Sequence, residues 1–284
     1  MKTITLSDGE RVPVLGQGTW RMGESTRAHK EEVAALQFGI ELGMTLIDTA
    51  EMYGEGGAEK VVADAIAGQR DRVFVVTKVY PHNASRTELP KTCEGSLKRL
   101  QIDVIDLYLL HWRERSTRLA ETVETFEKLR VAGKIRRWGV SNFDVEDMQE
   151  LWSIDNGTNC TANQVLYNLE NRQIESGLLP FLHQLSTVNQ QPVLMAYSPV
   201  GHGRGLLENA TLRKIAKRHD ATTSQIALAW VLRQSGVIAI PKASNEGHVR
   251  DNAHSIEIKL TNEDLIDLDR EFSAPKSKKP LPIL

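Results

Sequence analysis

The sequence has few of the features that mark secreted, membrane-spanning or nucleic-acid-binding proteins. Only two cysteines occur in 284 residues, Cys93 and Cys160, so no disulfide framework is indicated, and their spacing is not that of a metal site. No apolar run approaches the roughly 18 residues of a membrane span, and the N-terminal segment lacks the apolar core of a signal peptide. A net charge of -2 gives no electrostatic reason to expect nucleic acid or an anionic membrane as partner. We therefore expect a reduced, metal-free, cytoplasmic protein.

Strand-like and helix-like segments alternate along the chain after an opening hairpin. Asp8 and Gly9 lie between two short apolar segments within residues 4–14, which is a strong hairpin signal. Apolar runs then indicate strands at 15–20, 45–50, 73–79, 104–112, 136–142, 161–168, 192–199 and 237–242. Helical spacing of apolar residues indicates helices at 26–42, 58–67, 86–100, 119–132, 145–153, 174–185, 207–218, 223–234 and 262–271.

This alternation predicts an α/β fold, a (β/α)8 TIM barrel formed by residues 1–284 as a single domain. The strands are continuous apolar runs, as expected when core and helices cover both faces. A doubly wound open sheet would need a G-x-G-x-x-G turn, but Gly16-Gln17-Gly18 is followed by Thr-Trp and not by a helix N-terminus. We expect the hairpin to cap the barrel bottom, with two extra helices at 207–218 and 262–271.

Polar residues gather at the ends of the predicted strands. Asp48, Lys78 and His111 each close an apolar run, and Tyr53 follows Asp48 by five residues. In a barrel of parallel strands these ends meet at one mouth, where an acid, a cation and neutral donors would surround one point. This arrangement makes the chain a candidate enzyme. Other strand ends supply Trp20, Ser141, Asn142, Gln164, Tyr197, Ser198 and Lys242.

Eight motifs in order give the chain a specific resemblance. It resembles the aldo-keto reductase family over nearly its whole length, and looks most like the short bacterial members that reduce methylglyoxal and other aldehydes. The resemblance implies a single-domain barrel, a nicotinamide cofactor and carbonyl reduction. The matching motifs are GQGTW (16–20), LIDTAEMYG (46–54), VTK (76–78), LLHW (109–112), GKIRRWGVSNF (133–143), NQVLYN (163–168), AYSP (196–199) and IPKAS (240–244).

Carbonyl reduction assigns a role to each of four residues. Tyr53 is the expected proton donor, and because a free phenol has a pKa of about 10, the ammonium of Lys78 is expected to lower it. Asp48 would hold Lys78 and balance its positive charge. His111 would donate a hydrogen bond to the carbonyl oxygen of the substrate. Taken singly, these residues could be a helix cap, a solvated lysine, a packed aromatic and a satisfied histidine. Their joint occurrence in the motif order favours the catalytic interpretation.

The resemblance also implies a nicotinamide site. Ser141, Asn142 and Gln164 match positions that hold the carboxamide, and Tyr197 matches the ring that stacks on the nicotinamide. Ser198 and the glycine-containing loop 200–205 would approach the pyrophosphate. Taken alone, Asn142 could be a helix N-cap or turn residue, Tyr197 a core aromatic, and the loop an ordinary connection.

The adenosine end of the cofactor is expected at the last strand. By resemblance, Lys242, Ser244 and Asn245 grip the 2′-phosphate, and a cation with short polar side chains at a helix start suits an anion. His248 stands where an arginine is usual, and the residue after Lys242 is not the usual serine, so the grip is expected to be weaker. NADPH is the expected cofactor, with NADH possible. Asn252 matches a position that contacts the adenine.

The substrate pocket is expected to be shallow. Trp20 and Trp112 would form an apolar wall near the carbonyl, or else pack as rim tryptophans against helices. The charged residues 113–115 replace a frequent proline, which predicts a more open loop. A short tail after Phe272 predicts loose binding of small aldehydes such as methylglyoxal. We expect a monomer whose only partner is a small-molecule carbonyl substrate.

Two other functions stay open from the sequence. Some family members act as cofactor-sensing subunits with little turnover, which a steady-state rate with any aldehyde distinguishes from an enzyme. A lysine at a barrel strand end can also form an imine, as in an aldolase or lyase. Pairing of Lys78 with Asp48 argues against that chemistry, because a nucleophilic amine must be neutral.

Overall fold

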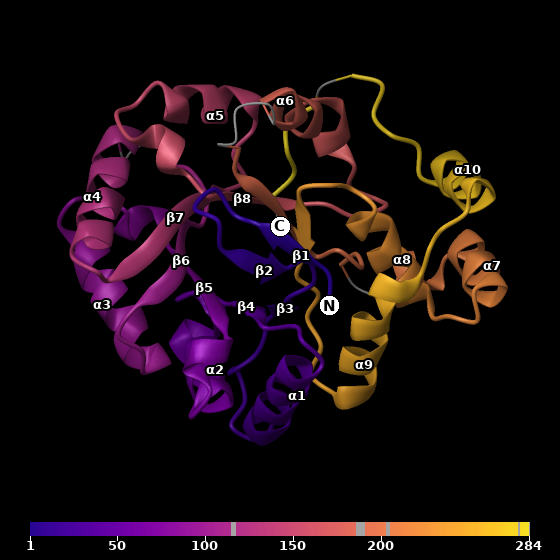
Figure 1. Cartoon of the computed structure of the whole chain (residues 1–284), viewed down its shortest axis with the longest axis horizontal. Helices are drawn as coiled ribbons and strands as arrows, with labels where there is room; N and C mark the ends of the chain where they lie inside the picture. The colour runs from indigo at the N-terminus through magenta and orange to yellow at the C-terminus, as the bar shows by residue number, and fades with distance from the viewer. Residues whose placement is uncertain (115–117, 186–190, 203–204, 278, 284) are drawn as a thin grey trace.

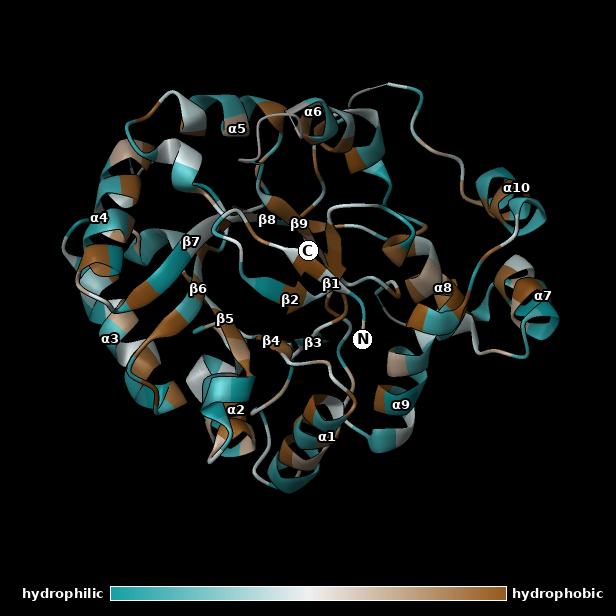
Figure 2. Cartoon of the chain, in the orientation of Figure 1, coloured by the Kyte–Doolittle hydropathy of each residue, from teal (hydrophilic) through white to brown (hydrophobic). Residues whose placement is uncertain are grey.

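A ring of short parallel strands lies at the centre of the molecule (Figure 1). The computed structural model describes residues 1–114, 118–185, 191–202, 205–277 and 279–283. Every strand of the ring is buried along nearly all of its length, and Figure 2 shows apolar residues along much of the central strands. The strands of the ring are β3 (Gln17–Gly18), β4 (Leu46–Asp48), β5 (Phe74–Val79), β6 (Ile105–Leu110), β7 (Ile135–Ser141), β8 (Ala162–Leu166), β9 (Val193–Tyr197) and β10 (Val237–Ala239).

The sheet closes on itself. Across the described ranges it has eight strands in the order β10-β9-β8-β7-β6-β5-β4-β3, all pairs parallel. Parallel bridges of Leu15 with Ala239 and of Gly18 with Lys242 join the two outer strands. A Cβ atom on Gly18 would lie 2.8 Å from the carbonyl oxygen of Ile240, so only glycine allows this close approach. The predicted (β/α)8 barrel is confirmed.

Helices surround the ring and cover its outer face (Figure 1). Each strand is followed by one of them, as a right-handed crossover between neighbouring parallel strands requires. Their inward faces carry buried apolar residues that pack on the sheet. These helices are α1 (His29–Glu41), α2 (Gly57–Ile66), α3 (Glu88–Leu100), α4 (Leu119–Val131), α5 (Val145–Trp152), α6 (Leu178–Leu185), α8 (Thr223–Leu232) and α9 (Glu246–His254).

The N-terminal hairpin covers the end of the barrel at which the strands begin. Strand β1 (Thr3–Thr5) pairs antiparallel with β2 (Arg11–Pro13), and the two lie across the centre of the ring in Figure 1. Their apolar side chains join the cluster that fills the barrel interior. Arg137 of β7 forms ion pairs with Asp8 and Glu10 of the hairpin turn, and its guanidinium lies 5.5 Å from the ring centre of Phe74. A buried arginine therefore clamps the hairpin to the barrel.

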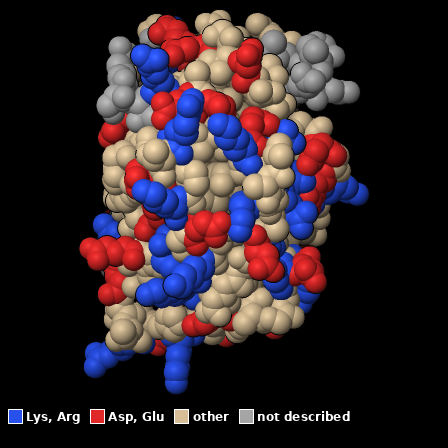
Figure 3. All heavy atoms as spheres, turned by 90° about the vertical axis from the view of Figure 1, so that its left-hand side faces the viewer, with Lys and Arg blue, Asp and Glu red and all other residues tan. Residues whose placement is uncertain are grey.

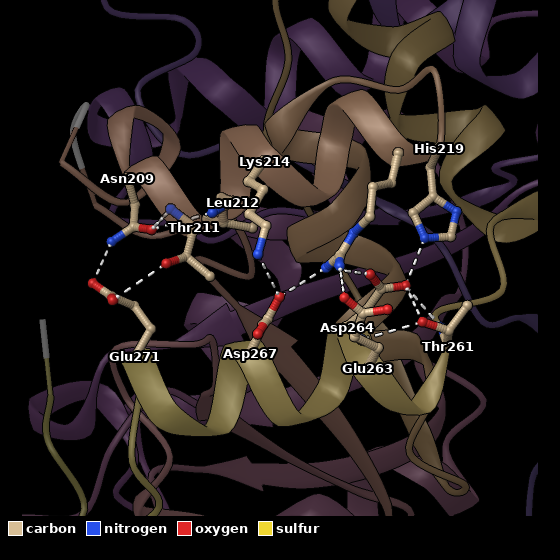
Figure 4. A network of polar contacts seen from close by, with 11 residues as sticks. Asn209, Thr211, Leu212, Lys214, His219, Thr261, Glu263, Asp264, Asp267 and Glu271 are labelled. Carbon is tan, nitrogen blue, oxygen red and sulfur yellow. Dashed lines mark hydrogen bonds and ion pairs between the residues drawn. The ribbon is translucent and has the colours of Figure 1, made fainter.

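Two further helices lie outside the ring beside α8, as predicted (Figure 1). Helix α7 (Ala210–Arg218) packs against α10 (Asn262–Glu271) through the polar network in Figure 4. Arg218 forms ion pairs with three acidic residues of α10, and His219 contacts one of them, Asp264, at 2.7 Å. Asn209 Oδ1 accepts from the backbone of Thr211 and Leu212. This cap is why α7 begins at 210 and not at 207.

The other predicted helices agree with the structure to within three residues at each end, except that one of them is interrupted. The expected helix 174–185 is split, because Gly177 has φ −153° and ψ −78°, outside the helical region. Residues Gln173–Ser176 form a 3-10 turn, and α6 starts only at Leu178.

The outer surface carries charges of both signs. Figure 3 shows lysine and arginine side chains interspersed with acidic ones on the face that includes α3 and α4. Glu124, for example, pairs with both Arg86 and Lys128. Interspersed charges of this kind do not form a single-sign surface for a polyanion. In the ranges that the structure describes, no helix has the length and apolar character needed to cross a membrane.

The hairpin clamp predicts a stability effect. Replacing Arg137 with alanine removes two ion pairs and a ring contact, and because Asp8 and Glu10 are about half exposed, we expect a loss of only about 1–2 kcal/mol in unfolding free energy. Denaturant unfolding measures the effect. Arg136→Ala is the matched control, because the neighbouring side chain of Arg136 is 59% exposed and makes one ion pair, with Asp106. Equal losses in both variants would contradict the clamp.

Candidate active site

A buried ion pair forms the centre of the site. Lys78 of β5 is fully buried, and its Nζ donates to Asp48 Oδ2 and to the carbonyl oxygen of Thr49, each at 2.8 Å. The second oxygen of Asp48 accepts from Gln164 Nε2 at 2.7 Å. Both charges are thus hydrogen-bonded on more than one side, which a charge pair removed from water requires.

Tyr53 lies against this pair. Its hydroxyl is 3.3 Å from Lys78 Nζ, and the centre of its ring is 4.8 Å from the same nitrogen. The chain leaves Tyr53 through a tight turn in which Gly54, Glu55 and Gly56 all have positive φ, 55°, 52° and 83°. Glycine adopts this conformation without strain, which explains the glycines that follow the tyrosine.

The pKa shifts correct one expectation. Burial lowers the pKa of Lys78, but the charge of Asp48 and the contact with Tyr53 outweigh it, so the lysine pKa lies above its ordinary value. Burial raises the pKa of Tyr53 more than Lys78 lowers it. Lys78 therefore lowers the pKa of Tyr53 as expected, but burial outweighs this effect, and the expectation of a net lowering below the free value is wrong. A lysine that stays protonated is also a poor imine-forming nucleophile.

His111 completes the group. Its ring lies edge-on to Tyr53, with ring centres 5.8 Å apart. Burial and the nearby charge of Lys78 lower the pKa of His111 to about 2, so the imidazole is neutral. Its buried Nδ1 has no hydrogen-bond partner among the described residues. The structure thus brings Asp48, Tyr53, Lys78 and His111 together at one mouth, as the sequence predicts.

The residues expected to hold the carboxamide also come together. Ser141 Oγ donates to the carbonyl oxygen of Gln164 at 2.8 Å, and Asn142 Nδ2 lies 3.2 Å from Ser141 Oγ. Tyr197 donates its hydroxyl proton to Asn142 Oδ1 at 3.0 Å. Asn142 has φ 62° and does not cap α5, because Asp144 fills that role. Gln164 binds Asp48, which links this amide group to the buried ion pair.

The expected pyrophosphate segment is partly described. Ser198 has φ 48°, and its carbonyl oxygen accepts from Asn168 Nδ2 at 2.9 Å. In the loop 200–205, Gly201 has φ 81°, and residues 203 and 204 lie outside the described residues.

The residues expected at the adenosine end surround the start of α9. Lys242 Nζ lies 3.2 Å from Ser244 Oγ, and Lys242 is exposed. Asn245 caps α9, accepting from the backbone of His248, and its amide nitrogen lies 3.0 Å from His248 Nδ1. Asn252 is buried on the same helix. The neighbouring Arg250 turns away from this group and lies over Phe38 of α1.

Aromatic residues line the mouth. Trp20 is 39% exposed, and its ring centre lies 5.0 Å from that of His202 with the planes tilted by 38°, which does not suit a tryptophan packed beneath helices. Trp112 contacts both His111 and Tyr80, with ring centres 5.0 and 5.6 Å away. Tyr80 was not predicted from the sequence, and His202 was expected only as part of the loop 200–205 near the pyrophosphate. The position of Tyr80, two residues after Lys78 at the end of a strand, is the signal that could have identified it.

The loop after Trp112, which was predicted to be more open, is held to α5 at Arg113. Arg113 donates to Asp147 and Glu150 of α5, at 2.7 and 2.6 Å, and its side chain is 24% exposed. The charge therefore ties the start of the loop to α5. Residues 115–117 lie outside the described residues.

This geometry agrees with a comparison to known families. A model described as the Aldo/keto reductase family matches residues 14–270. The chain belongs to the aldo/keto reductase family. Among relatives in this family, it is 52% identical over 284 residues to methylglyoxal reductase YeaE of Escherichia coli (strain K12), covering 99% of this chain and 98% of that protein.

Two further aldo/keto reductase relatives span nearly the whole chain. Glyoxal reductase of Bacillus subtilis (strain 168) is 33% identical over 269 residues, 94% of this chain and 91% of that protein. The crystal structure of an aldo/keto reductase from Klebsiella pneumoniae in complex with NADP and acetate superposes with a TM-score of 0.95 at 47% identity, covering 100% of this chain and 99% of that one.

The low pKa of His111 predicts a pH-dependent stability. His111 has a pKa of about 2 when folded, against an ordinary value of 6.5. Between these values only the unfolded chain binds the proton, so unfolding free energy falls as the pH falls below about 6.5. His111→Asn should remove a slope of up to about 1.4 kcal/mol per pH unit between about pH 6 and pH 5. Denaturant unfolding at several pH values measures it, with the exposed His82→Asn as control. An unchanged slope in His111→Asn would contradict the buried neutral state.

Proposed function

We propose that this chain is an NADPH-dependent reductase of aldehydes and small reactive carbonyls such as methylglyoxal, with Tyr53 as the proton donor. The line of contacts from Asp48 through Lys78 Nζ to the Tyr53 hydroxyl carries the proposal. It places a permanent positive charge next to a phenol at the barrel mouth, which is where barrel enzymes hold their catalytic groups.

The residues of the site have separable roles in this reaction. Bound NADPH supplies the hydride that reduces the carbonyl carbon. As negative charge develops on the carbonyl oxygen, Tyr53 donates its hydroxyl proton to that oxygen. The raised pKa keeps this proton in place until then, and the ammonium of Lys78 at 3.3 Å stabilises the phenolate that results. Neutral His111 has one ring N–H, which donates to the same oxygen and orients it.

The donor set suits a nicotinamide cofactor. Ser141, Asn142 and Gln164 offer a hydroxyl and two amides in one connected group, the chemistry that a carboxamide needs. Tyr197 is tied to this group through Asn142, which fixes the position of its ring. Preorganised partners of this kind hold a reactive ring in one orientation.

The adenosine end supports NADPH over NADH. Lys242 Nζ contacts Ser244 Oγ just before the start of α9. A cation, a hydroxyl and a helix N-terminus together favour the binding of a phosphate. Asn245 and His248 bind each other, so their side chains are already held near this position. The Klebsiella pneumoniae relative was solved with NADP.

Small dicarbonyls are the proposed substrates. The relatives with the names methylglyoxal reductase and glyoxal reductase cover nearly all of the chain. Trp20 and Trp112 offer aromatic surface at the mouth, and Trp20 is 39% exposed. A mouth of this kind suits a small, weakly held aldehyde better than a bulky ligand that needs an enclosing pocket.

The first test combines a substrate panel with removal of the phenol proton. The wild type should reduce methylglyoxal and glyoxal with NADPH faster than a bulky ketone. Tyr53→Phe should lower kcat at least about 100-fold and leave NADPH affinity nearly unchanged, since only the donated proton is lost. Stopped-flow rates and fluorescence titration measure the two quantities.

Tyr108→Phe is the matched control for this test. It also removes one phenol hydroxyl, from a buried tyrosine whose oxygen has no partner in the described part of the chain, and it should retain wild-type kcat. Full activity of Tyr53→Phe would disprove the role of Tyr53. Equal or faster turnover of the bulky ketone would remove small dicarbonyls as the preferred substrates.

The second test concerns the cofactor phosphate. Lys242→Ala should raise the KM for NADPH about 10-fold and change the KM for NADH less than about 2-fold, because only NADPH carries the 2′-phosphate. Initial rates at varied cofactor concentration measure both constants. Lys259→Ala, which removes another exposed lysine, should change neither. Equal effects of Lys242→Ala on the two cofactors would show that this lysine does not bind the phosphate.

A further inference from the structure

One carboxylate near the site is not used by the proposed chemistry. Glu51 lies two residues before Tyr53, and its Oε1 accepts from the backbone nitrogen of Tyr80 at 2.7 Å and from Asn83 Nδ2 at 3.2 Å. Its own backbone nitrogen donates to the carbonyl oxygen of Lys78 at 3.4 Å. Glu51 thus connects the segment that carries the phenol to the segment that follows the catalytic lysine.

The two donors mark the ends of a short turn. Strand β5 ends at Val79, so the amide of Tyr80 lies one residue beyond the strand. The next residues, Pro81–Asn83, form a 3-10 turn in which Asn83 N donates to the carbonyl oxygen of Tyr80 at 3.0 Å. A single oxygen of Glu51 therefore holds the first and the last residue of the turn Tyr80–Asn83. An acceptor shared in this way fixes the orientation of the turn relative to the barrel.

This turn carries part of the aromatic lining of the mouth. The ring of Tyr80 stacks on His82, with centres 4.7 Å apart and planes at 30°. It meets Trp112 edge-on at 5.6 Å and lies 6.4 Å from His111. Tyr80, His82 and Trp112, called here the aromatic wall, therefore stand next to the imidazole that faces the substrate carbonyl.

The environment of Glu51 does not suit a carboxylate kept for stability alone. Among the described residues, no lysine or arginine forms an ion pair with it, and burial raises its pKa with a further contribution from the charge of Glu59. An unpaired, partly buried carboxylate is costly to retain. The charge of the neighbouring Glu55 also raises the pKa of Tyr80. Glu55 is exposed, however, and makes no hydrogen bond to the described turn Tyr80–Asn83.

We propose that Glu51 is a positioning residue that sets the aromatic wall against the substrate through its hydrogen bonds to Tyr80 and Asn83. Its role rests on the proposed carbonyl reduction, and it acts on the fit of the substrate rather than on proton or hydride transfer. Loss of its acceptor oxygen should therefore loosen substrate binding. The cofactor site and the Lys78–Asp48 pair should be unaffected.

The experiment compares three variants with the wild type. Glu51→Ala should raise the KM for methylglyoxal about 10-fold, with kcat and NADPH affinity within about 2-fold of wild type. Glu51→Gln keeps an acceptor oxygen without the charge and should restore the KM to within about 2-fold. Glu55→Gln removes an equal charge that also faces Tyr80 and should have no effect.

Hydrogen exchange provides a readout that does not need turnover. The amide of Tyr80 should exchange at least about 10-fold faster in Glu51→Ala than in the wild type, and Glu51→Gln should retain protection. In a Tyr80→Ala background, Glu51→Ala should cause little further increase in KM, because both changes disrupt the same wall.

The outcomes separate this proposal from the proposed function. Absence of wild-type turnover of either dicarbonyl would remove the proposed function, while exchange at Tyr80 would still decide the role of Glu51. Unchanged exchange in Glu51→Ala overturns the proposal. So does a loss of kcat without a change in KM, or equal damage in Glu51→Gln and Glu51→Ala. Faster exchange with a raised KM that Glu51→Gln restores supports it.

Discussion

The ion pair between Lys78 and Asp48 is the interaction on which the rest of the mouth depends. Both groups are almost completely removed from water. An unpaired charge in such a buried position would be strongly unfavourable. The pair is tolerable because the barrel supplies further partners, the carbonyl oxygen of Thr49 for the ammonium and the amide of Gln164 for the carboxylate. These partners come from β8 and from the chain after β4. The ammonium is consequently fixed within reach of Tyr53, and the amide group that suits a nicotinamide is connected to the same carboxylate.

The two ends of the barrel use charge in different ways. At the hairpin end, Arg137 is paired with acidic groups of the hairpin, and buried Asp106 is paired with Arg70. Charges with such partners hold neighbouring elements of the fold together. At the mouth, His111 Nδ1 lacks a partner among the described residues, and the hydroxyl of Tyr53 accepts from Lys78, which also donates to Asp48 and Thr49. Incompletely satisfied polar groups in a partly open position are suited to binding and chemistry.

Much of the fold and the outline of the site could be predicted from the sequence. The apolar runs identified the barrel strands, and parallel strands force their ends to one mouth, so Asp48, Lys78 and His111 were expected together. The sign of the pKa shift of Tyr53 was predicted wrongly, because it depends on how much burial opposes Lys78. The contacts of Arg113 with α5 also depend on neighbours that no local pattern specifies. Glu51 was missed for the same reason, because its partners lie about 30 residues away in the chain.

The amino-acid sequence by itself determined the alternation of strands and helices, the glycines that permit close approach and tight turns, and the kinds of chemical group present at each strand end. These properties follow from local sterics and from the periodic burial of apolar side chains. Only the tertiary structure decided which charged and polar groups pair with one another, and how deeply Lys78 and Tyr53 are buried. It also decided that one oxygen of Glu51 holds both ends of the turn Tyr80–Asn83. Such contacts join residues from different strands and loops, and their strength depends on distance and exclusion of water, which the order of residues does not specify.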